Sequence, residues 1–67
     1  MKETTIKQLK PGDFFTLKPI EEPTENRVYV RDEYDRTEKR YYCYKFSDVN
    51  SGRYMPGNKT VYTDFTF

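Results

Sequence analysis

The amino-acid sequence predicts a small all-β protein, with a single domain over residues 1–67. Three observations lead to this class. A chain of this length has room for only one hydrophobic core. Its seven Tyr and five Phe favour strands, as do Val and Thr. It contains no Ala and only two Leu, so the residues that most favour helices are scarce.

The N-terminal part of the chain predicts one helical turn and one strand. We expect residues 1–3 to be a frayed terminus. Thr4 or Thr5 can cap a helical turn, which the Pro-Gly pair at 11–12 ends. Because proline fixes φ and glycine accepts positive φ, this pair indicates a tight turn. The first strand then follows over residues 13–18.

The middle of the chain predicts a long acidic loop and a hairpin. Residues 19–26 carry two prolines and three glutamates, and prolines cannot donate to a β-ladder. A second strand begins near residue 27, and the charged stretch 32–39 contains the hairpin turn. The third strand covers residues 41–46, and both of its faces carry aromatic residues. Alternation therefore does not decide which of the two faces is buried.

The C-terminal part of the chain predicts two further short strands. Residues 47–52 have the composition of a turn, residues 53–55 a short strand, and residues 60–66 the last strand. One helical turn followed by five short strands is the element order of an SH3-like barrel. An OB-like barrel is the alternative, but it usually carries a helix between its third and fourth strands, and this connection is too short for one.

Four short segments give the chain an outline that other proteins share. They are Leu9-Lys10-Pro11-Gly12-Asp13-Phe14-Phe15, the pair of strands Val28-Tyr29-Val30 and Tyr42-Cys43, and a final Val61-Tyr62 strand after a glycine turn. With these segments the sequence resembles small uncharacterised proteins of bacteria and their mobile elements, in an outline that extends over most of the chain. The resemblance implies a small β-barrel and implies no activity.

The residues that the chain lacks argue against catalysis. It has no His and one Cys, so general-base and zinc-site chemistry have almost no side chains to use. Cys43 stands between two tyrosines on a predicted strand and is expected to fill the core. A single Cys forms no internal disulfide, and no long apolar stretch follows Met1. The sequence therefore predicts a cytoplasmic protein that is not an enzyme and binds no metal, cofactor or membrane.

The number of large apolar side chains exceeds what a core of this size can hold. A densely packed interior this small accommodates about ten of them, whereas the chain has twelve aromatic and eight aliphatic residues. Several aromatic residues should therefore lie on the surface, where exposed rings often mark protein interfaces. We expect a binding or adaptor module with a protein partner, in which Phe14, Tyr29 and Tyr62 make the contacts.

The alternative function is binding of single-stranded nucleic acid by residues 36–45. This segment interleaves cations for phosphates with rings for bases, and its candidate contacts are Arg36, Lys39, Arg40, Tyr42, Tyr44 and Lys45. A solvated hairpin above a core strand explains the same pattern. Acidic neighbours and a formal net charge of +1 place the nucleic-acid reading second.

Overall fold

The computed structural model describes residues 1–66, and its regular structure consists of six strands and two short 3-10 turns. The strands are β1 (Lys2–Thr5), β2 (Phe14–Phe15), β3 (Tyr29–Asp35), β4 (Arg40–Lys45), β5 (Asp48–Met55) and β6 (Thr60–Thr63). No α-helix occurs in these 66 residues. The predicted all-β class is confirmed, with six strands in place of five.

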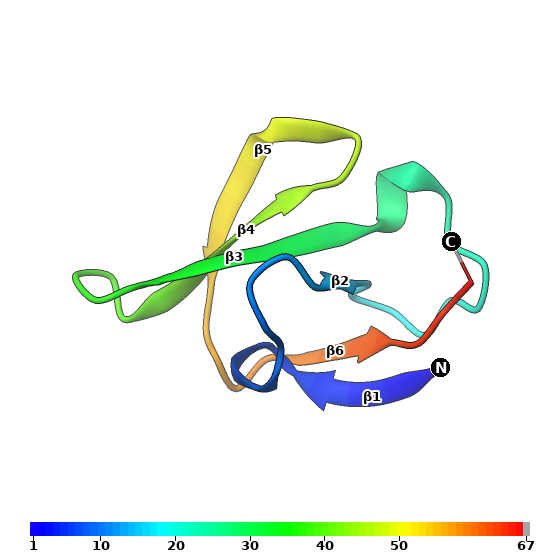
Figure 1. Cartoon of the computed structure of the whole chain (residues 1–67), viewed down its shortest axis with the longest axis horizontal. Helices are drawn as coiled ribbons and strands as arrows, with labels where there is room; N and C mark the ends of the chain where they lie inside the picture. The colour runs from blue at the N-terminus through cyan, green and yellow to red at the C-terminus, as the bar shows by residue number, and fades with distance from the viewer. Residues whose placement is uncertain (67) are drawn as a thin grey trace.

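The strands form two antiparallel sheets (Figure 1). The smaller sheet pairs β1 with β6, and the larger has the order β2-β3-β4-β5. The two sheets meet at Thr16, which follows β2 directly. The N–H of Thr16 donates to the carbonyl of Tyr62 at 3.0 Å, and the N–H of Tyr62 donates to the carbonyl of Thr16 at 3.0 Å. The strands of residues 1–66 do not close into the barrel that the sequence predicts.

The N-terminal segment is a strand, which corrects the expectation of a frayed terminus. Lys2 pairs with Thr63 and Thr5 with Thr60, so β1 covers one edge of β6. Covering that edge satisfies backbone groups that β6 would otherwise leave unpaired. The 3-10 turn η1 (Ile6–Gln8) follows Thr5, where the sequence predicts a helical turn. A second 3-10 turn, η2 (Glu25–Arg27), begins at the end of the predicted acidic loop and extends to Arg27, and the sequence does not predict it.

The hairpin strands are longer than their sequences indicate. β3 continues to Asp35, whose carboxylate accepts the N–H groups of Thr37 and Glu38 at 2.8 and 3.1 Å and so moves the turn further along the chain. β5 begins at Asp48, inside the stretch 47–52 that reads as a turn. Pairing with β4 overrides the local turn composition there, and the register shift between Tyr44 and Lys45 accommodates the three extra residues 49–51 of β5.

The hydrophobic core lies where the larger sheet faces β6 and η1. Its fully packed cluster consists of Ile6, Phe15, Tyr29, Cys43, Met55 and Val61. The rings of Phe15 and Tyr29 stack with centroids 5.7 Å apart. Cys43 is 0% exposed, and burial raises the pKa of its thiol to about 11. The cysteine is core filler, as predicted, and the Cys43 side of β4 is the buried one.

Candidate functional site

Five aromatic side chains gather on the outer face of the larger sheet, the face that points away from the core. Alternation along each strand places them there, because their chain neighbours Phe15, Cys43 and Met55 point inward. We call this set the aromatic face, and it consists of Phe14, Tyr42, Tyr44, Phe46 and Tyr54. Cross-strand register connects its members, since Tyr44 pairs with Val30, which pairs with Phe14, and Tyr42 pairs with Tyr54.

The aromatic face contains two edge-to-face ring pairs. Phe14 and Phe46 have centroids 5.4 Å apart and ring planes at 72°. Tyr42 and Tyr54 have centroids 5.4 Å apart and planes at 66°. This geometry suits the aromatic quadrupole and holds each ring in place. Phe14, Phe46 and Tyr54 nevertheless keep 41%, 39% and 40% of their surface exposed, so the rings cover each other only partly.

A glycine positions the ring of Tyr42. A Cβ built on Gly52 would overlap the hydroxyl end of that ring, so the tyrosine lies directly on the backbone of β5. A strand interior rarely contains glycine unless another group approaches the backbone closely. Gly52 therefore belongs to the architecture of the aromatic face, although its position in the sequence suggests only a turn.

A depression at the end of the aromatic face near the β3–β4 hairpin is lined by more carboxylates than cations. The hydroxyl of Tyr54 donates to Asp35 Oδ2 at 3.2 Å. The backbone N–H of Glu38 is the main cause that lowers the pKa of Asp35, so this carboxylate is ionised at neutral pH. The hydrogen bond from the Tyr54 hydroxyl to Asp35 raises the pKa of Tyr54. The depression, which lies beside Tyr42 and Tyr54, also includes Asp32 and Glu33, against the single cation Arg36.

The three residues predicted to contact a protein partner do not share a surface. Phe14 lies on the aromatic face, whereas Tyr62 is half-buried in β6, in the other sheet. Tyr29 is 7% exposed and belongs to the core, which corrects the prediction that it lies on an exposed surface for a protein partner. The reason is that β3 is a central strand: Val28 and Val30 are buried on one side of the chain and Tyr29 on the other.

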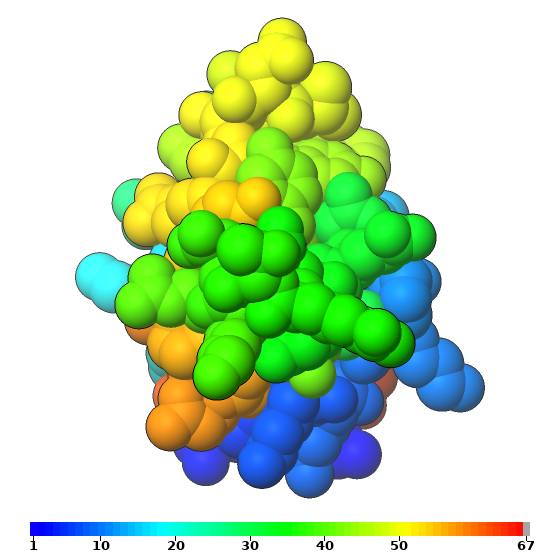
Figure 2. All heavy atoms as spheres, turned by 90° about the vertical axis from the view of Figure 1, so that its left-hand side faces the viewer, coloured from blue at the N-terminus to red at the C-terminus, as the bar shows by residue number. Residues whose placement is uncertain are grey.

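The six residues of the alternative site are also separated. Tyr42 and Tyr44 lie on the aromatic face, and Arg36, Lys39 and Arg40 lie at or beside the hairpin turn. Figure 2 shows this turn, in green, between β5 above and the N-terminal segment below.

Lys45 is the sixth residue of that set, and it lies elsewhere. It lines a cavity on the opposite side of the sheet together with Tyr29. Because Lys45 lies apart from Arg36, Arg40 and Tyr42, the six residues do not form one continuous surface.

Two members of the aromatic face, Phe46 and Tyr54, are not among the contacts that the sequence predicts. The sequence places Tyr54 in a short strand at 53–55 and Phe46 at the end of the third strand. The register of β4 and β5, which sets Tyr54 opposite Tyr42, brings Tyr54 to the aromatic face. Phe46 is held in position by its N–H, which donates to the carbonyl of Val28 at 2.9 Å.

Comparison with protein-family models, curated proteins and solved structures finds no significant match for this chain. The resemblance noted in the sequence therefore stays a prediction. Residues 1–66 include no group of three or more His, Cys, Asp or Glu side chains placed to hold a metal ion. Over the same residues, no helix has the length and apolar character needed to cross a membrane.

Proposed function

We propose that the protein is a non-enzymatic binding module that contacts a protein partner through its aromatic face. The observation that carries this proposal is the convergence of Phe14, Tyr42, Tyr44, Phe46 and Tyr54 on one side of a sheet whose other side already supplies the core. Exposed aromatic clusters are costly in water and are enriched at protein interfaces. Paired rings also lose little conformational entropy when a partner binds, which favours their use as contacts.

The chemistry at the hairpin end indicates the kind of protein surface that fits. In the depression beside Tyr42 and Tyr54, the carboxylates of Asp32, Glu33 and Asp35 outnumber the single cation Arg36. Arg40 lies outside this depression, on the same side of the sheet. A partner with an apolar patch bordered by lysine or arginine would be complementary in charge. We therefore infer a partner surface that is apolar at its centre and basic where it meets the β3–β4 hairpin.

Single-stranded nucleic acid remains the second candidate. Arg40 is the first residue of β4, two positions before Tyr42, so alternation places it on the side of the aromatic face. A phosphate chain passing Tyr42 would, however, also approach the ionised carboxylate of Asp35. This repulsion is the reason that we rank a protein partner first.

We further propose that the fold is an open variant of an SH3-like barrel. The support is that β2 and the adjacent Thr16 pair with both sheets, so the chain runs continuously from one sheet into the other. The short turn between β4 and β5 argues against the OB-like alternative, which places a helix after its third strand. Closure would need β5 to meet β1, the two outer strands.

A capture experiment tests the proposed function. The full chain, carried on a resin, is incubated with a lysate of the source organism and compared with the double variant Phe46→Ala, Tyr54→Ala. We expect the unaltered chain to retain a specific protein. The double variant should retain at least tenfold less of that protein. Val49→Ala is the matched control, because Val49 is 63% exposed and is not part of the aromatic face.

The outcome that contradicts this function is equally specific. Equal retention of every protein by the unaltered chain and the double variant would show that the aromatic face binds nothing in the lysate. Titration with single-stranded oligonucleotides at two salt concentrations separates the second candidate. Micromolar binding with a log-log salt slope of roughly −0.7 for each contacted phosphate would place nucleic acid first.

A further inference from the structure

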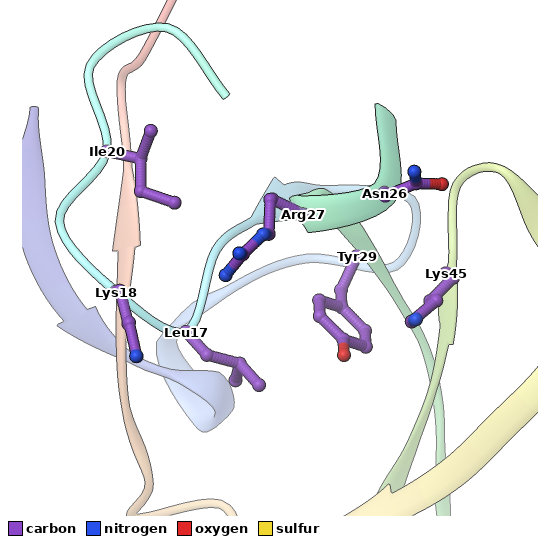
Figure 3. Close-up of a pocket in the computed structure, with 7 residues that line it drawn as sticks. All are labelled: Leu17, Lys18, Ile20, Asn26, Arg27, Tyr29 and Lys45. Atoms are coloured by element: carbon purple, nitrogen blue, oxygen red, sulfur yellow. The ribbon is translucent and has the colours of Figure 1, made fainter. Parts of the chain in front are cut away.

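A cavity of about 310 Å³ lies between the β2–β3 loop and the end of β4 (Figure 3). Its apolar side chains are Leu17, Ile20 and Tyr29, and its cations are Lys18, Arg27 and Lys45. Asn26 completes the lining. Figure 3 shows that Leu17, Ile20 and Arg27 project toward the same space, with Tyr29 between them and Lys45. The volume is at the small end of the range typical of sites for small organic molecules.

The strand pairing explains how the cations meet. Lys18 and Arg27 stand immediately before and after the acidic loop 19–26. Because β2 and β3 are antiparallel neighbours, with Phe15 opposite Tyr29, the chain returns on itself and brings both ends of the loop to one place. Lys45 joins them because it pairs with Tyr29 from the other side, in β4. Residues that are far apart in the sequence thus form one cluster.

The loop that forms the cavity wall is fastened at several points. The hydroxyl of Thr16 donates to the carbonyl of Lys18 at 2.6 Å. The N–H of Arg27 donates to the carbonyl of Thr24 at 2.9 Å, within the η2 turn. The hydroxyl of Ser47 donates to Asn26 Oδ1 at 3.2 Å and ties η2 to the β4–β5 turn. The wall is therefore largely formed before any ligand arrives, which lowers the entropic cost of binding.

The charged side chains that line the cavity are cations. Among residues 1–66, no carboxylate lines it and none forms an ion pair with its three cations. The two glutamates Glu21 and Glu22 line a separate depression, beside the C-terminal residues 64–66. A further cation, Arg53, stands over the ring of Tyr29 with 5.9 Å from Cζ to the centroid. In a chain with a formal net charge of only +1, this is a marked local concentration of cations.

We propose that this cavity binds a small amphipathic carboxylate. The apolar body of the ligand contacts Leu17, Ile20 and Tyr29, and its carboxylate accepts charge-assisted hydrogen bonds from the guanidinium of Arg27. Lys45, on the other side of Tyr29, adds to the positive potential of the cavity. At the roughly 30 Å³ that one water molecule occupies in the liquid, the cavity equals about ten water-sized groups, which is the size class of a small organic acid. The site lies on the opposite side of the sheet from the aromatic face and does not depend on the function proposed for that face.

A titration of the full chain followed by amide chemical shifts tests the proposal. The probe is octanoate, which joins an apolar chain to one carboxylate and has the expected size. We expect saturable shifts at Leu17, Ile20 and Tyr29. Acetate carries the charge without the apolar body, and octan-1-ol carries the body without the charge. Both should bind at least tenfold more weakly, because each keeps only half of the interaction.

Charge variants provide the matched comparison. Arg27→Gln should weaken octanoate binding about tenfold, because it removes a charge-assisted hydrogen bond. Lys45→Gln should weaken it about threefold, because it removes a positive charge that lines the cavity without bonding the carboxylate directly. Lys59→Gln removes the same charge from an exposed residue that does not line the cavity, and it should leave the affinity unchanged within about twofold. Chemical shifts of the free variants verify that each one is folded.

A second arm distinguishes the two sources of such a carboxylate. Short peptides that end in leucine are compared with a free and with an amidated C-terminus. Preference for the free peptide over octanoate assigns the site to a peptide C-terminus, and preference for octanoate assigns it to a free organic acid. Acetate, inorganic phosphate or octan-1-ol binding as tightly as octanoate would overturn the proposal, as would equal affinity in Arg27→Gln, Lys45→Gln and Lys59→Gln.

Discussion

The inner and outer faces of the β2-β3-β4-β5 sheet are built from residues that are adjacent in sequence, but the inner side chains are buried and the outer ones are partly exposed. Phe15 is fully buried and its neighbour Phe14 is 41% exposed, while Met55 is buried and Tyr54 is 40% exposed. The inner side chains pack against β6 and η1, whereas the outer ones pack in pairs against each other. The comparison teaches that aromatic content fixes the class of fold but does not say which rings stabilise the protein and which remain available for contact.

Truncation of one phenylalanine from each face should give the largest difference. Phe15→Ala removes a fully buried ring from the core and should lower the free energy of unfolding by about 3–5 kcal/mol. For a domain of this size that loss approaches the whole stability. Phe14→Ala removes a ring that is partly in water already and should cost less than about 1.5 kcal/mol. Urea unfolding followed by circular dichroism measures both values.

The two faces would lose their distinction if Phe14→Ala cost as much as Phe15→Ala. That result would mean that the aromatic face is a second core. The function proposed for it would then have no free surface to act through.

A smaller effect is expected at Gly52. Gly52→Ala places a methyl group where the Tyr42 ring lies, so the ring must move off β5. We expect the free energy of unfolding to fall by about 1–2 kcal/mol. The loss is no larger because the hydroxyl end of the ring can turn toward solvent. In a Tyr42→Ala background the same substitution should cost markedly less, since the two residues are coupled. Additive losses in this double-mutant cycle would contradict the contact.

The thiol of Cys43 gives the smallest and most specific test of how dry the inner face is. Burial raises its pKa from an ordinary value near 9 to about 11. The folded state therefore holds the proton more tightly than the unfolded state. Its contribution to stability is complete below pH 9 and is lost as the pH rises toward 11.

Two measurements check this expectation. Stability between pH 9 and 11 should fall more steeply for the unaltered chain than for Cys43→Ala, which keeps every tyrosine and lysine. A thiol reagent should label Cys43 only after denaturant is added, because the side chain is fully buried. Rapid labelling of the folded protein would show that the inner face opens to solvent.

Composition and local signals were sufficient for the fold class and for several elements. The abundance of Tyr and Phe indicated strands, the turn after Thr5 was found where expected, and Cys43 lies in the core. The start of β5 was missed because Ser47 to Gly52 has turn chemistry, and only pairing with β4 makes it a strand. Tyr29 was misplaced because alternation cannot reveal that a strand is covered on both sides.

The candidate sites depend even more on tertiary arrangement. The sequence-based prediction groups Lys45 with Arg40 because the two are close in sequence, whereas strand pairing places Lys45 at the cavity. The sequence does not predict Lys18 and Arg27 as site residues, because each lies just outside the acidic loop 19–26 and the two are nine positions apart. Their clustering follows from the antiparallel return of β3 on β2, which no local pattern specifies.

The pairing of β1 with β6 has a consequence for how the molecule folds. Lys2 and Thr63 stand near opposite ends of the chain, so their contact closes a loop that contains almost every other residue. Closing so long a loop costs more entropy than forming the meander from β2 to β5, in which each strand pairs with the next one along the chain. We therefore expect β1 to dock last, after the transition state. Substitutions in β1 should then speed unfolding and leave the folding rate nearly unchanged.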